Sequence, residues 1–267
     1  MKKWIILLMF FTFQATAQDE FFVLSGQSSS TLREGLISYW EFDEVSGTTA
    51  FDSNGSNAMT IATGVTVNQP GSTSLSYDKS YSYNGTSGQL NLTNATPFSG
   101  LSAITISAWV YSTYTTTTDE YRIIASKLHS SWVSPYYQFQ LRVRFGSQKV
   151  FEFVVGTSTA FSGATSSTNS YFTGFWRHVV GMYDSTTGDI RLYVDGEYNV
   201  ANIPVPLYEP IGTANTPFHI GDDSDLFSNF KNWNGKIDKV MIYNRELTLP
   251  EIEFLYNGGV GRHFNEL

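Results

Sequence analysis

Cysteine is absent from this chain of 267 residues. Without thiols the protein forms no disulfide, has no thiolate nucleophile, carries no lipid on cysteine and holds no zinc through sulfur. A chain of this length needs no disulfides for stability, because it is long enough to bury a sizeable hydrophobic core. The lack of cysteine therefore limits the chemistry of the protein more than its stability.

Positive charge is also scarce. The chain has 16 Lys and Arg residues against 24 Asp and Glu residues, which gives a formal net charge of −8. Nucleic-acid-binding proteins need a basic surface that replaces the counterions on the phosphates. We therefore expect no nucleic-acid partner. An acidic chain is compatible with bound divalent cations and with neutral ligands such as glycans.

Long apolar runs are missing except at the N-terminus. Two lysines precede a mostly apolar run at residues 4–13, and Ala-Thr-Ala follows at residues 15–17. This order predicts a signal peptide at residues 1–17, with a buried N-terminal strand or helix as the alternative. Since a membrane helix needs roughly 20 apolar residues, we expect no membrane span. The predicted location is extracellular or at the cell surface, with the periplasm also open.

What the chain does contain is strand patterns. Residues 138–145 alternate polar and apolar side chains, which indicates an antiparallel strand with one wet face. Residues 104–111 alternate too, but both faces carry large side chains, which predicts a strand covered on both sides. Asp195-Gly196 predicts a two-residue hairpin turn, and the Asn-Gly pairs at 54–55, 84–85 and 234–235 are further turn signals.

A single helix is predicted, near the C-terminus. Thr248 can cap it, Pro250 suits its first turn, Glu251 lies near its positive end and Asn257 precedes the glycines that end it. Strands along most of the chain followed by one late helix predict an all-β, two-sheet sandwich or jelly roll. We divide the remainder into a flexible N-terminal arm at residues 18–34 and one domain at residues 35–267.

Four motifs in order resemble the concanavalin A-like, laminin-G-like jelly-roll domains. They are the Gly-Leu-Ile-Ser-Tyr-Trp opening at 35–55, Ile-Thr-Ile-Ser-Ala-Trp-Val at 104–110, the Trp-x-His-Val hairpin at 176–197 and the Gly-x-Ile-Asp strand with its helix at 235–257. The resemblance implies an antiparallel jelly-roll sandwich with one short C-terminal helix. It leaves function open, because this fold carries lectins, adhesion modules, carbohydrate-binding appendages and some glycosidases.

The acids needed for glycoside hydrolysis are incomplete. Related sandwich glycosidases carry Glu-x-Asp-x-Glu or Glu-x-Asp-x-x-Glu, which places acid and nucleophile on one face. The nearest match is Glu41-Phe-Asp43, which lacks the third acid and which we interpret as edge or metal-site residues. The Gly-x-Ser-x-Gly and His-Glu-x-x-His motifs are absent as well. We predict a non-catalytic protein, with a glycosidase or lyase that uses another acid pair as an alternative.

The resemblance also implies a structural Ca²⁺ where the opening and closing motifs meet. Calcium takes several oxygen ligands, and the acidic and amide side chains in those motifs are Asp43, Asp52, Asn54 and Asp238. We expect these four residues to contribute to that site. The alternative is that residues 52–55 form a turn in which the side chains bond to the backbone. The four histidines show no pair with metal-ligand spacing on one element.

Loop aromatics and an acidic loop are the predicted ligand-binding residues. Aromatic faces can stack on sugar rings, and carboxylates can accept hydrogen bonds from sugar hydroxyls. The candidates are Trp132, Tyr136 and Trp233 together with Asp222, Asp223 and Asp225. Core packing of the aromatics and simple solvation of the acidic loop remain open as alternatives.

Together these features predict a secreted, non-catalytic module that binds carbohydrate or another surface polymer. The alternative is a structural or adhesive protein that binds other protein chains in a surface layer, filament or particle. The arm at residues 18–34 motivates this alternative, because an extended segment can add a strand to a neighbouring sheet.

Overall fold

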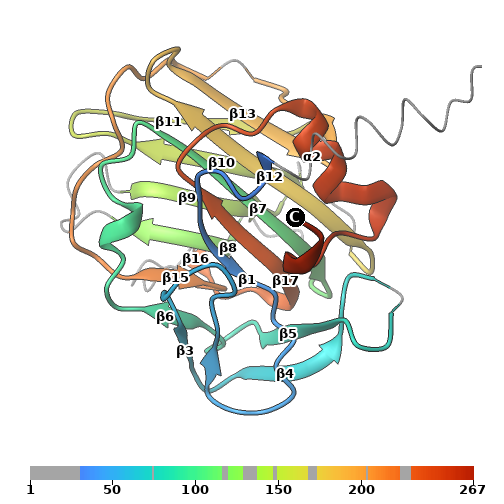
Figure 1. Cartoon of the computed structure of the whole chain (residues 1–267). Helices are drawn as coiled ribbons and strands as arrows, with labels where there is room; N and C mark the ends of the chain where they lie inside the picture. The colour runs from blue at the N-terminus through green and yellow to red at the C-terminus, as the bar shows by residue number, and fades with distance from the viewer. Residues whose placement is uncertain are drawn as a thin grey trace, which may run out of the picture.

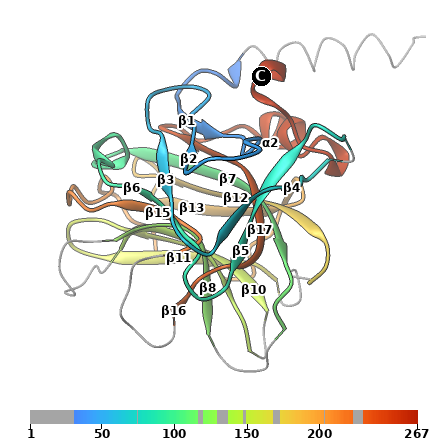
Figure 2. The ribbon, with the colours of Figure 1, turned by 90° about the horizontal axis from the view of Figure 1, so that it is seen from below.

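The computed structural model describes residues 31–73, 75–115, 120–128, 137–146, 149–167, 173–202, 204–222 and 230–267. Their strands form two sheets that pack face to face (Figures 1 and 2). The pairing is antiparallel throughout both sheets, except that β16 runs parallel to β8. The predicted all-β jelly-roll sandwich is confirmed.

The first sheet has eight strands in the order β14-β13-β12-β7-β17-β5-β4, with β1 also paired to β17. The second has nine, in the order β11-β10-β9-β8-β15-β6-β3-β2, with β16 also paired to β8. The bounds of the strands are β1 Leu36–Trp40, β2 Thr49–Ala50, β3 Met59–Ile61, β4 Val65–Pro70, β5 Lys79–Asn84, β6 Leu90–Leu92, β7 Ala103–Ser112, β8 Tyr121–Leu128, β9 Tyr137–Arg144, β10 Val150–Gly156, β11 Phe161–Thr165, β12 Trp176–Asp184, β13 Asp189–Val194, β14 Glu197–Tyr198, β15 Phe218–Ile220, β16 Phe230–Lys231 and β17 Asn234–Tyr243.

The helix predicted near the C-terminus is α2, Leu249–Tyr256. Thr248 and Glu251 form a reciprocal capping box at its start, and Asn257 ends it in the left-handed conformation. Short 3-10 turns lie at Thr96–Phe98, Asn257–Gly259 and Phe264–Glu266. The helix packs on the outer face of the first sheet, where Ile252 and Leu255 join a small apolar cluster with Val180 and Met182.

Most turn predictions hold, and one does not. Asp195 and Gly196 both have positive φ, 54° and 82°, as a right-twisted two-residue hairpin requires. Asn234-Gly235, however, begins β17 instead of forming a turn. At Gly235 an added Cβ would lie 2.0 Å from the Tyr111 carbonyl oxygen, so the glycine serves the close approach of β7 to β17.

The N-terminal boundary of the domain also needs correction. Leu32 is fully buried in the cluster beneath α2, and Thr31 Oγ1 donates a hydrogen bond of 2.8 Å to Glu251 Oε1. Burial of an apolar side chain holds this segment against the sheet. The folded domain therefore includes residues 31–34, which we had assigned to the flexible arm, and the rest of that arm lies outside the described residues.

The candidate site lies beside a β-bulge in β17, between two strands that pair with the same side of β17. On one side of β17, β5 pairs with its first half and β1 with its second half, as the Ile237–Tyr81 and Trp40–Val240 pairs show. The register against β7 shifts between Asp238 and Met241, which inserts one extra residue as a β-bulge. The chain therefore leaves β1 next to a gap between β1 and β5.

Candidate functional site

The segment that leaves β1 carries two carboxylates into this gap. Phe42 lies between them with a positive φ of 60° and turns its ring inward, where it stacks on Tyr81 at a centroid distance of 4.6 Å. Glu41 and Asp43 therefore project outward. The Lys79 amide at the start of β5 donates a 2.7 Å hydrogen bond to Asp43 Oδ1 and fixes that side chain.

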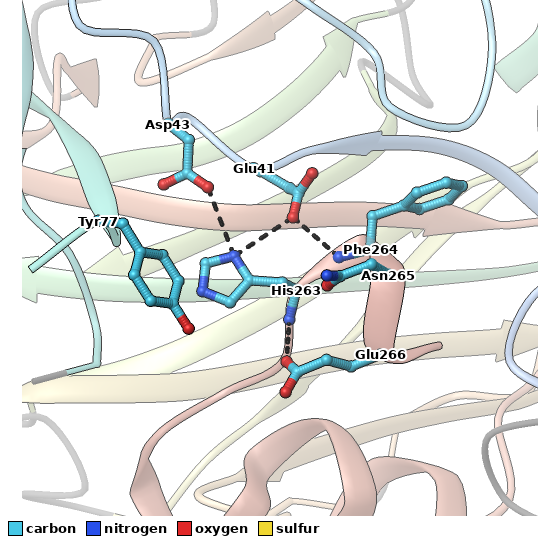
Figure 3. Close-up of a pocket in the computed structure, with 7 residues that line it drawn as sticks. All are labelled: Glu41, Asp43, Tyr77, His263, Phe264, Asn265 and Glu266. Carbon is cyan, nitrogen blue, oxygen red and sulfur yellow. Dashed lines mark hydrogen bonds and ion pairs between the residues drawn. The ribbon is translucent and has the colours of Figure 1, made fainter. Parts of the chain in front are cut away.

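A pocket of about 390 Å³, here called the tail pocket, forms where the C-terminal tail covers these carboxylates. Figure 3 shows His263 between Glu41 and Asp43 on one side and Tyr77 on the other. The His263 and Tyr77 rings are 5.5 Å apart at 47°. Tyr77 is 63% exposed, whereas His263 is only 8% exposed. The pocket thus joins a buried imidazole to an open aromatic wall.

The imidazole lies close to both carboxylates. His263 Nδ1 is 3.3 Å from Glu41 Oε1 and 3.4 Å from Asp43 Oδ2. Hydrogen bonding to Asp43 and Glu41 raises the pKa of His263 to about 10, although burial opposes the shift. Burial would raise the pKa of Glu41, but hydrogen bonds from His263, the Phe264 amide and Ser53 outweigh it and lower that pKa.

A buried ion-pair network lies directly behind the imidazole. Lys239 Nζ contacts Asp78 Oδ1, Asp238 Oδ2 at 2.9 Å and Ser72 Oγ at 3.1 Å, and all these side chains are buried. Burial alone would lower the pKa of Lys239, but the two carboxylates outweigh it and raise that pKa. Asp78 Oδ1 also lies 3.5 Å from His263 Nε2, so the network reaches the tail pocket.

The structure does not bring the four predicted calcium ligands together. Asp52 accepts hydrogen bonds from the Tyr39, Asn54 and Asn57 amides, and Asn54 donates to the Leu36 carbonyl. These two residues therefore form the turn that was the alternative. Asp238 is compensated by the Lys239 ammonium group, which already supplies a cation there. This set does not fit a calcium ion.

Among described residues, the group whose ligand atoms do converge is Glu41, Asp43 and His263, with one atom from each within 4.8 Å of the others. Asp43 was predicted as a metal ligand, and Glu41 was noted only as an edge or metal-site residue. His263 was missed because it is 222 positions from Glu41 and shares no element with another donor. Only the path of the tail over the β1–β5 gap reveals it.

The predicted ligand-binding residues need one correction. Trp233 is fully buried in the main core, and its indole Nε1 donates a 3.1 Å hydrogen bond to the Lys236 carbonyl, so it is unable to stack on a ligand. Asp222 is partly buried just after β15. The remaining predicted residues, Trp132, Tyr136, Asp223 and Asp225, lie outside the described residues.

A second hollow of about 470 Å³ lies at the edge of the sandwich beside β13 and β14. Tyr198 and Arg191 contribute to its wall, together with the segment that carries Pro204 and Pro206. Arg191 is held by ion pairs of 2.6 Å to Asp189 and Glu246. The hollow is therefore polar at one end, but it lacks the converging carboxylates and imidazole of the tail pocket.

Among the described residues, no helix has the length and apolar character to cross a membrane.

Part of this chain is similar in sequence to a human receptor. The human adhesion G-protein coupled receptor D1 is 27% identical over 89 residues, which is 33% of this chain and 10% of the receptor. The chain therefore spans about a tenth of the curated relative that it matches. The shared region includes only part of either protein.

Several solved structures have the same fold. The botulinum neurotoxin serotype D ligand-binding domain in complex with N-acetylneuraminic acid has a TM-score of 0.62 at 15% identity, over 86% of this chain and 52% of that one. The binding domain of Paraclostridial Mosquitocidal Protein 1 has a TM-score of 0.63 at 18% identity, over 85% and 52%. A Trypanosoma rangeli sialidase has 0.61 at 14%, over 92% and 39%.

At these identities the structures show the fold alone. The sequence itself matches the family described as the concanavalin A-like lectin/glucanases superfamily over residues 84–253. That stretch runs from the end of β5 into α2 and includes most strands of both sheets. The chain belongs to the concanavalin A-like lectin/glucanase superfamily.

Proposed function

We propose that this protein is a secreted, non-catalytic module that binds carbohydrate through the tail pocket. The observation that carries the proposal is an exposed tyrosine ring beside partly exposed carboxylates in an open pocket. Tyr77 offers an apolar face to the C–H side of a sugar ring. Asp43, whose side chain is 34% exposed, can accept hydrogen bonds from hydroxyl groups.

Charge favours a neutral glycan. Two carboxylates, Glu41 and Asp43, face one imidazole in the pocket, Glu266 also lines it, and the whole chain has a net charge of −8. An anionic sugar would be repelled by this excess of negative charge. The neurotoxin domain of the same fold that is described in complex with N-acetylneuraminic acid supports carbohydrate as the ligand class, but not that particular sugar.

The state of the carboxylates supports a non-catalytic role. A glycosidase needs one carboxylic acid that stays protonated, with a raised pKa, to protonate the leaving group. Glu41 has a lowered pKa, because His263, Ser53 and the Phe264 amide bind its ionised form. Both of its oxygens already accept hydrogen bonds, of 2.8 Å each, from Ser53 and Phe264. This carboxylate is thus held as a fixed anion.

Secretion is proposed from residues 1–17, which have the order of charge, apolar run and small residues of a signal peptide. Detection of the chain in the culture medium or at the cell surface, with Gln18 as its N-terminus, would support this part. Retention of an uncleaved chain inside the cell would contradict it.

A glycan-array screen of the purified chain tests the binding proposal. Neutral glycans should bind, and Tyr77→Ala should weaken binding by about fivefold or more, since an aromatic contact contributes roughly 0.5–1.5 kcal/mol beyond area burial. Tyr208→Ala is the matched control, because Tyr208 is 68% exposed and does not line the tail pocket. A hit that responds equally to both variants would refute the assignment to this pocket.

The second candidate is an adhesive protein with a protein partner. The 89-residue similarity to an adhesion receptor supports it, because that protein is named for adhesion. Size-exclusion chromatography and the glycan screen together distinguish the two candidate functions. A large stable assembly with no glycan hit would favour adhesion, and a monomer with a glycan hit would favour carbohydrate binding.

A further inference from the structure

The tail pocket contains three donor atoms of the kind that bind metal ions, and they come from opposite ends of the chain. Glu41 and Asp43 follow β1, and His263 lies in the tail after α2. We propose that Glu41 Oε1, Asp43 Oδ2 and His263 Nδ1 bind one divalent transition-metal ion of the Zn²⁺ class. This site shares only Asp43 with the predicted calcium site, and it does not rest on carbohydrate binding.

The distances are long for charge-assisted hydrogen bonds, and they also fit ligands of a shared ion. His263 Nδ1 is 3.3 Å from Glu41 Oε1 and 3.4 Å from Asp43 Oδ2. Charge-assisted hydrogen bonds between such groups are shorter, at about 2.7–2.9 Å. Ligands that surround a tetrahedral ion at about 2.1 Å lie roughly 3.4 Å apart. Both separations therefore match edges of a metal coordination shell.

The surroundings hold the donors in place. The Phe264 amide donates 2.8 Å to Glu41 Oε1, and the Lys79 amide donates 2.7 Å to Asp43 Oδ1. His263 is 8% exposed, and its second nitrogen, Nε2, has no hydrogen-bond partner among the described residues but lies 3.5 Å from Asp78 Oδ1. A carboxylate behind the far nitrogen of a ligating histidine orients the ring in metal sites.

The donor set selects the class of ion. Calcium and magnesium take oxygen ligands, whereas imidazole with carboxylates suits Zn²⁺ and its neighbours. Three protein ligands leave at least one coordination position for water or a ligand oxygen. The pocket of about 390 Å³ that these residues line supplies room for it. The site is therefore open and exchangeable.

Metal titration of the full chain, freed of metal by a chelator, tests the proposal. Isothermal titration with Zn²⁺ should give one site per chain, and Ca²⁺ should bind at least tenfold more weakly. Co²⁺ should produce visible absorption bands typical of a low-coordinate site with nitrogen and oxygen ligands. His263→Gln and Asp43→Asn should each lower Zn²⁺ affinity on the order of 100-fold and remove the Co²⁺ bands, since outer-sphere changes alone cost 10–100-fold.

Two controls keep the result interpretable. Glu209→Gln removes a partly exposed carboxylate that does not line the pocket and should leave binding unchanged. Because the Asp43 side chain is partly exposed, the Asp43→Asn variant should fold normally. The circular dichroism spectrum and melting curve of this variant check that its fold is intact. Absence of a stoichiometric Zn²⁺ site would overturn the proposal. Binding that survives His263→Gln, or that prefers Ca²⁺, would also overturn it, because imidazole would then not be a ligand.

Discussion

Removal of the Lys239 ammonium group should be among the most damaging single changes to the fold. Lys239 Nζ lies between Asp78 and Asp238, and all three side chains are at most 1% exposed. Lys239→Met keeps the length and apolar stem of the side chain but removes its charge. Two buried carboxylates would then face each other without the ammonium group between them.

The expected cost is about 3–5 kcal/mol, the usual result of breaking a buried ion pair by removing one partner. With a urea m-value of about 2–3 kcal/mol/M, this corresponds to a midpoint lowered by roughly 1–2.5 M. The double variant Lys239→Met, Asp238→Asn should regain part of this loss, because one of the uncompensated charges is then gone.

Urea unfolding followed by tryptophan fluorescence measures these effects. Lys236→Met is the matched control, since Lys236 lies three positions earlier on β17, is partly exposed and contacts no carboxylate among the described residues. Its ammonium group donates a 3.3 Å hydrogen bond to the Pro70 carbonyl and lies 5.4 Å from the Tyr111 ring centroid. Its cost should stay within about 1 kcal/mol. A cost below about 1 kcal/mol for Lys239→Met would refute our account of the network as a compensated buried charge cluster.

Two further predictions concern acid sensitivity and the domain boundary. Burial lowers the pKa of His178 to about 3. As the pH falls, His178 therefore takes up its proton in the unfolded chain before it does so in the folded protein. Stability should fall between about pH 6.5 and pH 3, by up to about 1.4 kcal/mol per pH unit. Urea midpoints at pH 7, 6, 5 and 4 measure this loss. His178→Asn carries no titrating ring and should make stability depend less steeply on pH. If the variant and the wild type lose stability with pH at the same rate, the assignment to His178 is contradicted. Leu32→Ala should cost about 2–5 kcal/mol, because Leu32 is fully buried under α2, and a thermal melt unchanged from wild type would return residues 31–34 to the flexible arm.

The regular parts of the fold could be predicted from the sequence because they follow local rules. The alternation at residues 138–145 became β9, but the expected wet face was wrong, because Gln138, Gln140 and Arg142 are buried. The cap and stop signals at Thr248 and Asn257 became the ends of α2. Asn234-Gly235 was mispredicted as a turn because the need for glycine came from a strand that is distant in sequence. Tyr111 on β7 approaches Gly235, and no local pattern carries that information.

The candidate site was predictable only in part, for a similar reason. Asp43 was identified because it belongs to a recognisable opening motif. His263 and Tyr77 lie in irregular segments, and they meet Asp43 only after β1, β5 and the tail are assembled around β17. Trp233 lies in a polar stretch that suggests exposure, yet in the connection between β16 and β17 it is fully buried. Burial of a loop aromatic depends on the neighbouring strand, which the local sequence does not specify.

The bulge in β17 explains why Asp238 is paired inside the protein instead of facing the tail pocket. Regular alternation would place Asp238 and Lys239 on opposite faces of β17. The extra residue and the positive φ of 48° at Lys239 instead bring its ammonium group to 2.9 Å from Asp238. The chain thus supplies its own cation to the inner carboxylates, and that internal charge also neutralises Asp78 behind His263. The outer carboxylates, Glu41 and Asp43, are left with one imidazole between them, which is why a divalent ion is better accommodated there than at Asp238.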